Sequence, residues 1–205
     1  MIQLENVSKS FDGKMILTDF SVSISNNEFV TVMGKSGSGK TTLLNLMGLL
    51  DVPDKGNIKI MNVLNPRTKD IEKLRRYHFG YIFQNYVLIE NKTVQENLLL
   101  SAKFRPNMSR NELINALSRV KLDESFLEKK VYQLSGGEQQ RLAVARIIIK
   151  PCDIIFADEP TGNLDEHNKR MILSLFQELR EEGKTIICVT HDREIAEHSS
   201  RTINL

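Results

Sequence analysis

Short runs of apolar, β-forming residues recur along the chain, and segments with apolar residues at helical spacing lie between them. The runs predict strands over residues 29–33, 57–61, 80–83, 152–157 and 185–190. Leucines at helical spacing predict a helix from Thr41 to Leu50, directly after a segment rich in glycine and serine. Strands that alternate with helices are typical of an α/β fold.

The middle of the chain has a different pattern from its two ends. Residues 93–150 are mostly helical in periodicity, with a break at Arg105-Pro106-Asn107. Further helices are predicted over 71–78, over 166–182 before Gly183, and near the C-terminus. The sequence therefore predicts an α/β core that carries a helical insertion.

Length and composition indicate one globular domain. At roughly 150 residues per domain, 205 residues leave no room for a second catalytic unit. The 28 basic and 26 acidic residues give a net charge of +2, without the clustered basic excess typical of nucleic-acid-binding proteins. We therefore expect no nucleic-acid partner. Cys152 and Cys188 lie in apolar runs, and we expect buried, reduced thiols.

Neither a signal peptide nor a membrane span is predicted. The first residues lack the basic and then apolar order of a signal peptide. No stretch of about 18 uninterrupted apolar residues occurs, since Asn45 and Gly48 already interrupt the apolar run of the first predicted helix. We expect a cytoplasmic protein that meets a membrane only through a partner.

Residues 34–41, GKSGSGKT, match the phosphate-binding pattern G-x-x-x-x-G-K-[ST] between a predicted strand and a predicted helix. Glycines allow such a loop to curl so that backbone N–H groups point at phosphate oxygens, and the helix adds its positive N-terminal end. A glycine- and serine-rich hairpin or linker is the alternative, but the flanking strand and helix favour a nucleotide site. The residues expected to bind the nucleotide here are Gly34, Ser36, Gly37, Ser38, Gly39, Lys40, Thr41 and Thr42.

Two adjacent acids, Asp158 and Glu159, end the predicted strand over 152–157. Asp158 is expected beside the phosphate loop, where its carboxylate can hold a magnesium ion. Glu159 would then face the terminal phosphate and orient or deprotonate a water. Two solvated acids before Pro160 are the alternative, which the upstream phosphate loop makes the weaker one.

Residues 134–141, LSGGEQQR, open a further predicted helix. Ser135 and Glu138 have the spacing of a capping box. That box explains neither the Gly136-Gly137 pair nor the polar run over 139–141. Because a helix N-terminus with small residues is also an anion site, the motif predicts a second segment that binds the same nucleotide.

These three motifs together resemble those of the ATP-binding subunits of ABC transporters. The resemblance implies a P-loop NTPase core, a RecA-like mixed sheet with flanking helices, joined to an antiparallel β part and a helical subdomain. It makes residues 1–205 one domain, with the nucleotide-binding core over 1–83 and 151–205 and the helical signature subdomain over 84–150. It also implies ATP and Mg²⁺ as ligands and ATP hydrolysis as the activity.

Four smaller matches follow in the family's order, each with an alternative. Phe11 sits where an aromatic usually stacks on adenine, although it could be a core aromatic. Gln84 resembles the lid-loop glutamine that senses magnesium, although a lone glutamine is usually a surface amide. Asp165 resembles the D-loop aspartate and could also cap the next helix. His191 resembles the switch histidine, although it could be a structural histidine.

In the family, ATP lies between the phosphate loop of one subunit and the signature of another, so one chain supplies two half-sites. We therefore expect ATP-dependent, head-to-tail dimerisation of two copies. The resemblance assigns catalysis to Lys40, Gln84, Glu159 and His191, magnesium to Thr41, Gln84 and Asp158, and further nucleotide contacts to Phe11, Ser135, Gly137, Glu138 and Asp165.

Residues 48–51, GLLD, and 161–165, TGNLD, are similar to ATPases of the lipoprotein-release, macrolide-efflux and bacteriocin-export type. This similarity implies an integral membrane permease as partner, a place on the inner face of the cell membrane, and export or membrane extraction of peptides or lipophiles. The chain stops at Leu205, where relatives usually continue, and a bacteriocin-exporter-like subgroup would fit that shortness. Alternatives are a mechanotransmission ATPase, an importer subunit, a soluble ABC ATPase and a small-molecule kinase.

Overall fold

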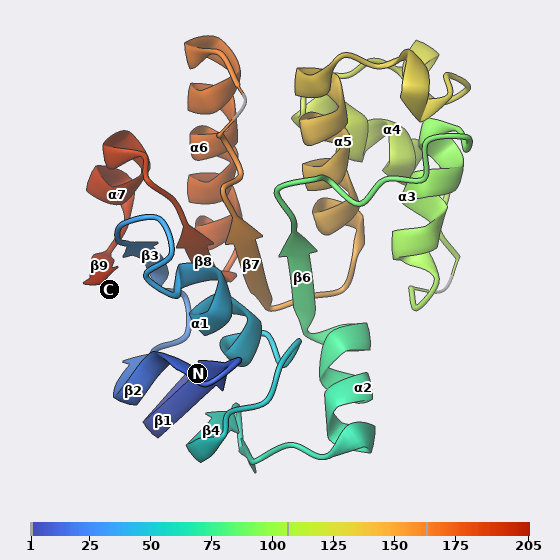
Figure 1. The fold of residues 1–205 in the computed structure, drawn as a ribbon. Coiled ribbons are helices and arrows are strands. Elements are labelled where there is room, and N and C mark those ends of the chain that lie inside the picture. Colours follow the sequence, from blue (N-terminus) through green and yellow to red (C-terminus); the bar gives the residue numbers. More distant parts are fainter. Residues whose placement is uncertain (1, 106, 163) are drawn as a thin grey trace.

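The computed structural model describes residues 2–105, 107–162 and 164–205. Its strands form a four-stranded antiparallel sheet and a five-stranded parallel sheet (Figure 1). The strands are β1 (Ile2–Phe11), β2 (Lys14–Ile24), β3 (Phe29–Met33), β4 (Lys55–Ile60), β5 (Val63–Leu64), β6 (Phe79–Ile82), β7 (Ile154–Asp158), β8 (Thr185–Val189) and β9 (Arg201–Asn204).

The helices flank these sheets and fill the middle of the chain. Capping boxes begin α3, α4 and α5 at Thr93, Ser109 and Ser135, which confirms the helical middle that the periodicity predicts. None of the helices in the described residues is both long and apolar enough to cross a membrane. The helices are α1 (Lys40–Met47), α2 (Thr68–Tyr77), α3 (Val94–Ala102), α4 (Arg110–Arg119), α5 (Gly136–Ile149), α6 (Glu166–Glu181) and α7 (Arg193–His198), with 3₁₀ turns at Glu124–Phe126 and Val131–Gln133.

The parallel sheet runs in the order β6-β7-β8-β3-β9 and separates two apolar clusters. In β7, Ile154 and Phe156 pack on the side of α1 and the antiparallel sheet, whereas Ile155 and Ala157 pack on the side of α5 and α6. Because both faces are covered, the central strands are continuous apolar runs, which is why they can be recognised in the sequence.

The antiparallel sheet runs in the order β2-β1-β4-β5. The apolar pattern predicts no element before Phe29, yet β1 and β2 are the longest strands described. Register shifts between Leu4 and Val7 and again before Lys9 interrupt the alternation of buried and exposed positions along β1. These irregularities remove the period of two on which strand prediction depends.

The predicted end of the first helix is wrong. The first helix ends at Met47 rather than at Leu50, because Gly48 caps it and Leu49 takes a left-handed backbone with φ 56°. After the predicted last helix, the tail forms β9, which pairs with β3 at the edge of the parallel sheet. Cys152 and Cys188 are buried free thiols, as predicted.

Candidate active site

Four loops that carry predicted site residues leave the same edge of the parallel sheet. β3 leads into the phosphate loop, β6 towards Gln84, β7 into Asp158 and Glu159, and β8 towards His191. The strands run parallel in the order β6-β7-β8-β3, so their carboxyl ends meet at one edge. Ligands of open α/β sheets bind at such an edge.

The phosphate loop is shaped by Gly39, the residue before α1. Its φ of 98° lies in the left-handed region, and a Cβ there would lie 2.7 Å from Cγ2 of Ile16. The loop borders a hollow of about 240 Å³, whose lining residues are Ile16, Gly37, Gly39, Lys40, Thr41 and Thr42. Ile16 is absent from the predicted site, since only the approach of β2 to the loop brings it there.

Lys40 and Thr41 begin α1 and face different partners. Nζ of Lys40 donates to the carbonyl oxygens of Gly34 and Lys35, at 3.0 and 2.9 Å. Oγ1 of Thr41 donates to the carboxylate of Asp158, at 3.2 and 3.4 Å. Burial raises the pKa of Asp158, and the neighbouring charge of Glu159 adds to this, although the Thr41 hydrogen bond opposes it.

Glu159 and His191 form the next pair along the edge. Nδ1 of His191 lies 3.0 Å from Oε2 of Glu159, with the histidine side chain 72% exposed and the glutamate 16% exposed. Glu159 itself has a left-handed backbone with φ 46°, which is rare for a residue with a side chain. Strained backbone of this kind clusters at functional sites.

Two buried polar atoms in this region have no hydrogen-bond partner among the described residues. They are Oγ of Ser38 in the phosphate loop and Oε2 of Glu159, which lies close to Nδ1 of His191 but makes no hydrogen bond with it. Each such atom costs about 1–3 kcal/mol if it stays unsatisfied. The Ser38 hydroxyl can donate to a phosphate oxygen, and the Glu159 carboxylate can accept from a water. The oxygens of Thr41 and Asp158 are of the kind that Mg²⁺ prefers. The residues therefore fit a nucleoside triphosphate and its metal.

The signature turn begins α5 and lies apart from α1 (Figure 1). The backbone N–H and the hydroxyl of Ser135 donate to the Glu138 carboxylate at 2.7 and 2.8 Å, which completes the predicted capping box. Burial by itself would raise the pKa of Glu138, but these two bonds and nearby cations outweigh it and lower that pKa. Ser135 and Gly136 are exposed, so the turn is accessible to a second molecule.

Comparison with known proteins decides the family. A family model described as "ABC transporter" matches residues 17–162. The chain belongs to the ABC transporter family. It is an ATP-binding cassette of this family of ATPases, as the motifs predict.

Relatives cover the cassette along its whole length. The lipoprotein-releasing system ATP-binding protein LolD of Aquifex aeolicus (strain VF5) is 38% identical over 212 residues, which are 100% of this chain and 93% of that protein. The macrolide export ATP-binding/permease protein MacB 2 of Yersinia pestis bv. Antiqua (strain Antiqua) is also 38% identical, over 214 residues. That match covers 100% of this cassette and 31% of MacB 2, so the chain spans about a third of the macrolide-export relative.

A solved structure confirms the predicted fold class. The dimeric post-hydrolysis state of the ATP-binding cassette MJ0796, bound to ADP and Pi, superposes with a TM-score of 0.92 at 38% identity. The match covers 100% of this cassette and 94% of that chain.

Contacts that the motifs do not predict join the signature helix of the cassette to the segment after Glu159. The Gln140 side chain is buried and donates to the carbonyl of Pro160. Arg141 donates to Asn168 on α6, and Asn168 donates in turn to Asp165. In the sequence, the capping box does not account for the polar run over 139–141. This run was the signal from which these contacts could have been predicted.

Asp165 caps α6 by accepting from the backbone of Asn168 at 2.8 Å, so its predicted capping role is confirmed. That bond is the largest cause of the lowered pKa of Asp165. One turn on, Lys169 pairs with Asp192 at 2.9 Å, with both side chains 16% exposed. Asp192 follows His191 and caps α7. Asn163 of the predicted D-loop lies outside the described residues.

Phe11 and Gln84 are predicted site residues whose side chains are exposed. Phe11 ends β1, is 47% exposed, and has Nζ of Lys9 at 5.0 Å from its ring centre. The alternative of a core aromatic is therefore wrong. Gln84 lies exposed in the turn after β6, at the same sheet edge as Asp158. Contact of either residue with a nucleotide stays a prediction.

Proposed function

We propose that this cassette binds and hydrolyses ATP, and that two copies close head to tail around two ATP molecules to drive a membrane permease. One observation carries the proposal. The phosphate loop, Asp158, Glu159 and His191 meet at one sheet edge, whereas the signature turn of the same chain lies exposed and apart from it. A second copy would supply Ser135, Gly137 and Glu138 to complete each site.

In this proposal the phosphate loop binds the triphosphate. Lys40 exchanges its carbonyl partners for the β- and γ-phosphate oxygens, and Ser38 donates its buried hydroxyl. Thr41 and Asp158, with Gln84, would hold Mg²⁺, which neutralises phosphate charge when bound. Desolvation of Asp158 makes its negative charge costly until a cation arrives, which favours binding of the metal.

Glu159 would orient or deprotonate the attacking water, because its buried Oε2 has an acceptor site to spare. His191 beside it would contact the γ-phosphate and hold the carboxylate in place. Phe11 would stack on the adenine. Asp165, at the start of α6, would lie at the contact between the two copies.

The same proposal assigns different roles to the two parts of the chain. Residues 1–83 and 151–205 would act as the nucleotide-binding core, and residues 84–150 as the helical signature subdomain. The permease would dock where this subdomain meets the turn after β6, on the cytoplasmic face of the membrane. By analogy with the named lipoprotein-releasing and macrolide-export relatives, we propose peptides or lipophilic molecules as the exported cargo.

Dimerisation tests the proposal directly. Glu159→Gln should retain ATP without hydrolysing it, so size-exclusion chromatography should show a dimer with ATP and a monomer without it. Glu159→Gln combined with Ser135→Arg is the matched control, because it keeps the phosphate loop and blocks the signature turn. A Glu159→Gln protein that stays monomeric at concentrations where ATP binding is measured would contradict the head-to-tail arrangement.

A further inference from the structure

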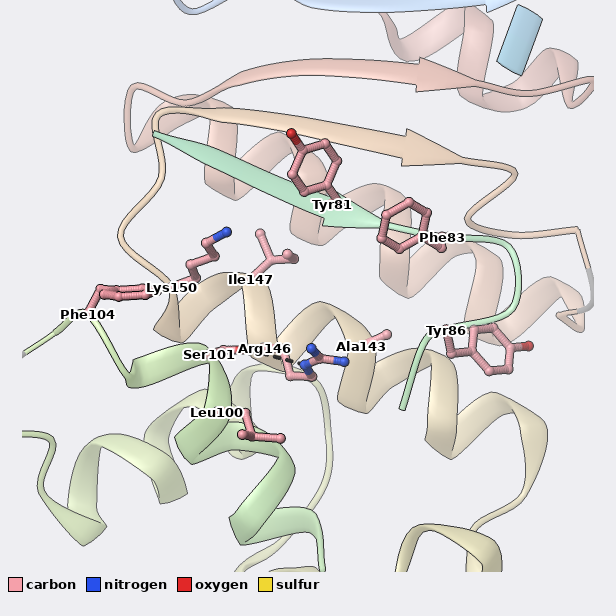
Figure 2. Close-up of a pocket in the computed structure, with 10 residues that line it drawn as sticks. All are labelled: Tyr81, Phe83, Tyr86, Leu100, Ser101, Phe104, Ala143, Arg146, Ile147 and Lys150. Carbon is pink, nitrogen blue, oxygen red and sulfur yellow. Dashed lines mark hydrogen bonds between the residues drawn. The ribbon is translucent and has the colours of Figure 1, made fainter. Parts of the chain in front are cut away.

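Lys150 and Lys9 each hold an ammonium group beside an aromatic ring, and the two rings differ in how they are held. Figure 2 shows Lys150 in a hollow of about 190 Å³ together with Tyr81, whose ring centre lies 5.8 Å from Nζ. Tyr81 is fixed by other contacts, because its hydroxyl donates to the carbonyl of Gly48 and its ring stacks with that of Phe83. Lys150 therefore adds little to the orientation of that ring.

Phe11, the aromatic residue beside Lys9, has fewer contacts to hold its ring. It ends β1, next to the tight turn at Asp12 and Gly13, and is 47% exposed. Phenylalanine has no hydroxyl to donate, and within the described residues no second aromatic ring packs against Phe11. Nζ of Lys9 lies 5.0 Å from the ring centre, within the range of cation–π attraction. The ammonium group of Lys9 is thus the contact that can orient this ring.

Lys9 is itself fixed by the turn between α1 and β4. The residue is only 7% exposed, and its Nζ lies 2.8 Å from a carboxylate oxygen of Asp51 and 3.8 Å from one of Asp54. It also donates to the carbonyl of Val52 at 2.8 Å. The hydroxyl of Ser10 donates to Asp54 at 2.7 Å, and this bond is the largest cause of the lowered pKa of Asp54. Because a buried lysine is costly without such partners, its ammonium group is held in one position.

The same turn is attached to the helix that begins at the phosphate loop. That helix, α1, begins at Lys40, where the nucleotide phosphates are expected to bind. The backbone N–H of Asp51 donates to the carbonyl of Asn45 at 3.3 Å, which joins the turn to the end of α1. Lys9 therefore connects the exposed ring of Phe11 to the element that would bind the phosphates.

We infer that Lys9 is a positioning residue for the adenine base, because it holds the ring of Phe11 at a fixed distance from the phosphate loop. The inference rests on the proposed stacking of Phe11 on adenine and adds the side chain that orients the ring. Since the cation lies over one face of the ring, the base would stack on the other. A ring that is ordered beforehand loses less conformational freedom when the base binds, so the nucleotide binds more tightly.

The first test measures the base and the phosphates separately. ADP carries both, whereas inorganic diphosphate carries the phosphates alone. With Mg²⁺ present, Lys9→Met should raise the Kd for ADP about fivefold and leave the Kd for diphosphate unchanged in isothermal titration calorimetry. Lys9→Arg keeps the charge and should keep the affinity for ADP. Lys55→Met, which replaces an exposed lysine at the start of β4, is the matched control and should change neither Kd.

The second test shows whether Lys9 acts through the ring. Phe11→Ala should raise the Kd for ADP about tenfold, because it removes the stacking of the base. Adding Lys9→Met to Phe11→Ala should raise it no further, since no ring is left to orient. Asp51→Asn keeps Lys9 but removes its closest carboxylate, and it should also raise the Kd for ADP and not that for diphosphate. It takes the place of Lys9→Met if thermal melts show that variant to be unfolded.

The outcomes separate this inference from the proposed function. Equal losses of ADP and diphosphate affinity would make Lys9 a purely structural residue. An unchanged Kd for ADP in Lys9→Met, or a further rise in the double variant, would also overturn the inference, while a weakened Phe11→Ala still supports the stacking of the base. A Phe11→Ala variant that binds ADP as tightly as the original protein overturns the proposed adenine contact and the inference with it.

Discussion

The phosphate loop and the signature turn both place a helix N-terminus where an anion can bind, but they are built differently. The phosphate loop lies against a covered sheet and leaves the Ser38 hydroxyl without a hydrogen bond, while across the edge Oε2 of Glu159 makes none either. The signature turn is exposed, and Ser135 and Glu138 satisfy each other. The first region is incomplete without its ligand. The second is complete alone, which suits a surface that is offered to another molecule.

The largest expected effect concerns the chemistry at the phosphate-loop edge. Glu159→Gln should lower kcat for ATP hydrolysis by about 10²–10⁴, because it removes the acceptor for the proton of the attacking water. Phosphate release measures the rate, and a thermal shift measures ATP binding, which should persist. Glu181→Gln, an exposed acid on α6, should leave both unchanged. Hydrolysis at the original rate would remove Glu159 from the mechanism.

Loss of the loop lysine should abolish binding. ATP at 100 times its dissociation constant should raise the free energy of unfolding by about 2.7 kcal/mol, which a thermal melt detects. Lys40→Ala should remove that gain, since its ammonium is expected to reach the phosphates. Lys35→Ala, in the same loop and exposed, should retain most of it. An undiminished gain in Lys40→Ala would refute the assignment of the site.

Substituting one glycine in each region compares how much a side chain at that backbone position changes the free energy of unfolding. Gly39→Ala should lower the free energy of unfolding by about 1–3 kcal/mol, because its φ is left-handed and its Cβ would collide with Ile16. Gly136→Ala should be neutral or stabilise by up to about 1 kcal/mol, since a Cβ there meets nothing within 4 Å. Urea unfolding of the two variants checks the contrast, and equal losses would refute it.

The cap of the signature turn should matter less for stability than for association. Ser135→Ala should cost about 1 kcal/mol of unfolding free energy, as should Ser109→Ala, which removes the same kind of cap from α4. In the Glu159→Gln background, only Ser135→Ala should also weaken the ATP-dependent dimer. Equal dimers in both variants would show that the signature serine is only a cap.

The smallest expected effects are pH-dependent changes in stability, which have opposite signs in the two regions. The pKa of Asp158 is raised above its ordinary 3.8, so its charge destabilises the nucleotide-free fold at neutral pH. Asp158→Asn should therefore raise stability at pH 7, and the gain should vanish below about pH 3.8. The pKa of Glu138 is lowered from 4.5, so its charge stabilises above that value and the contribution is lost as pH falls through its folded pKa. Glu138→Gln should thus destabilise at pH 7. Gains or losses of the opposite sign would contradict this reading of the two carboxylates.

The sequence was informative where one local cause determines a structure. Central strands such as β7 and β8 are apolar throughout because both faces are covered, and the capping box of α5 depends on four neighbouring residues. The fold class and the three motifs were therefore predictable. β1 was not, because its register shifts break the alternation.

The rest of the site depends on contacts between distant segments. Ile16 borders the phosphate loop because β2 passes beside Gly39. Arg141 meets Asn168, 27 residues further on, through the packing of α5 beside α6. Neither relation has a periodicity or a spacing that marks it in the chain.

The contacts of Arg141 with Asn168 and of Lys169 with Asp192 both lie in the first turn of α6. The start of α6 is therefore joined to the helix that would bind a neighbour's nucleotide and also to the segment of the histidine that would contact this copy's own. A shift of that one turn would reach both. In a closed pair, the fate of one ATP would thus be felt beside the other.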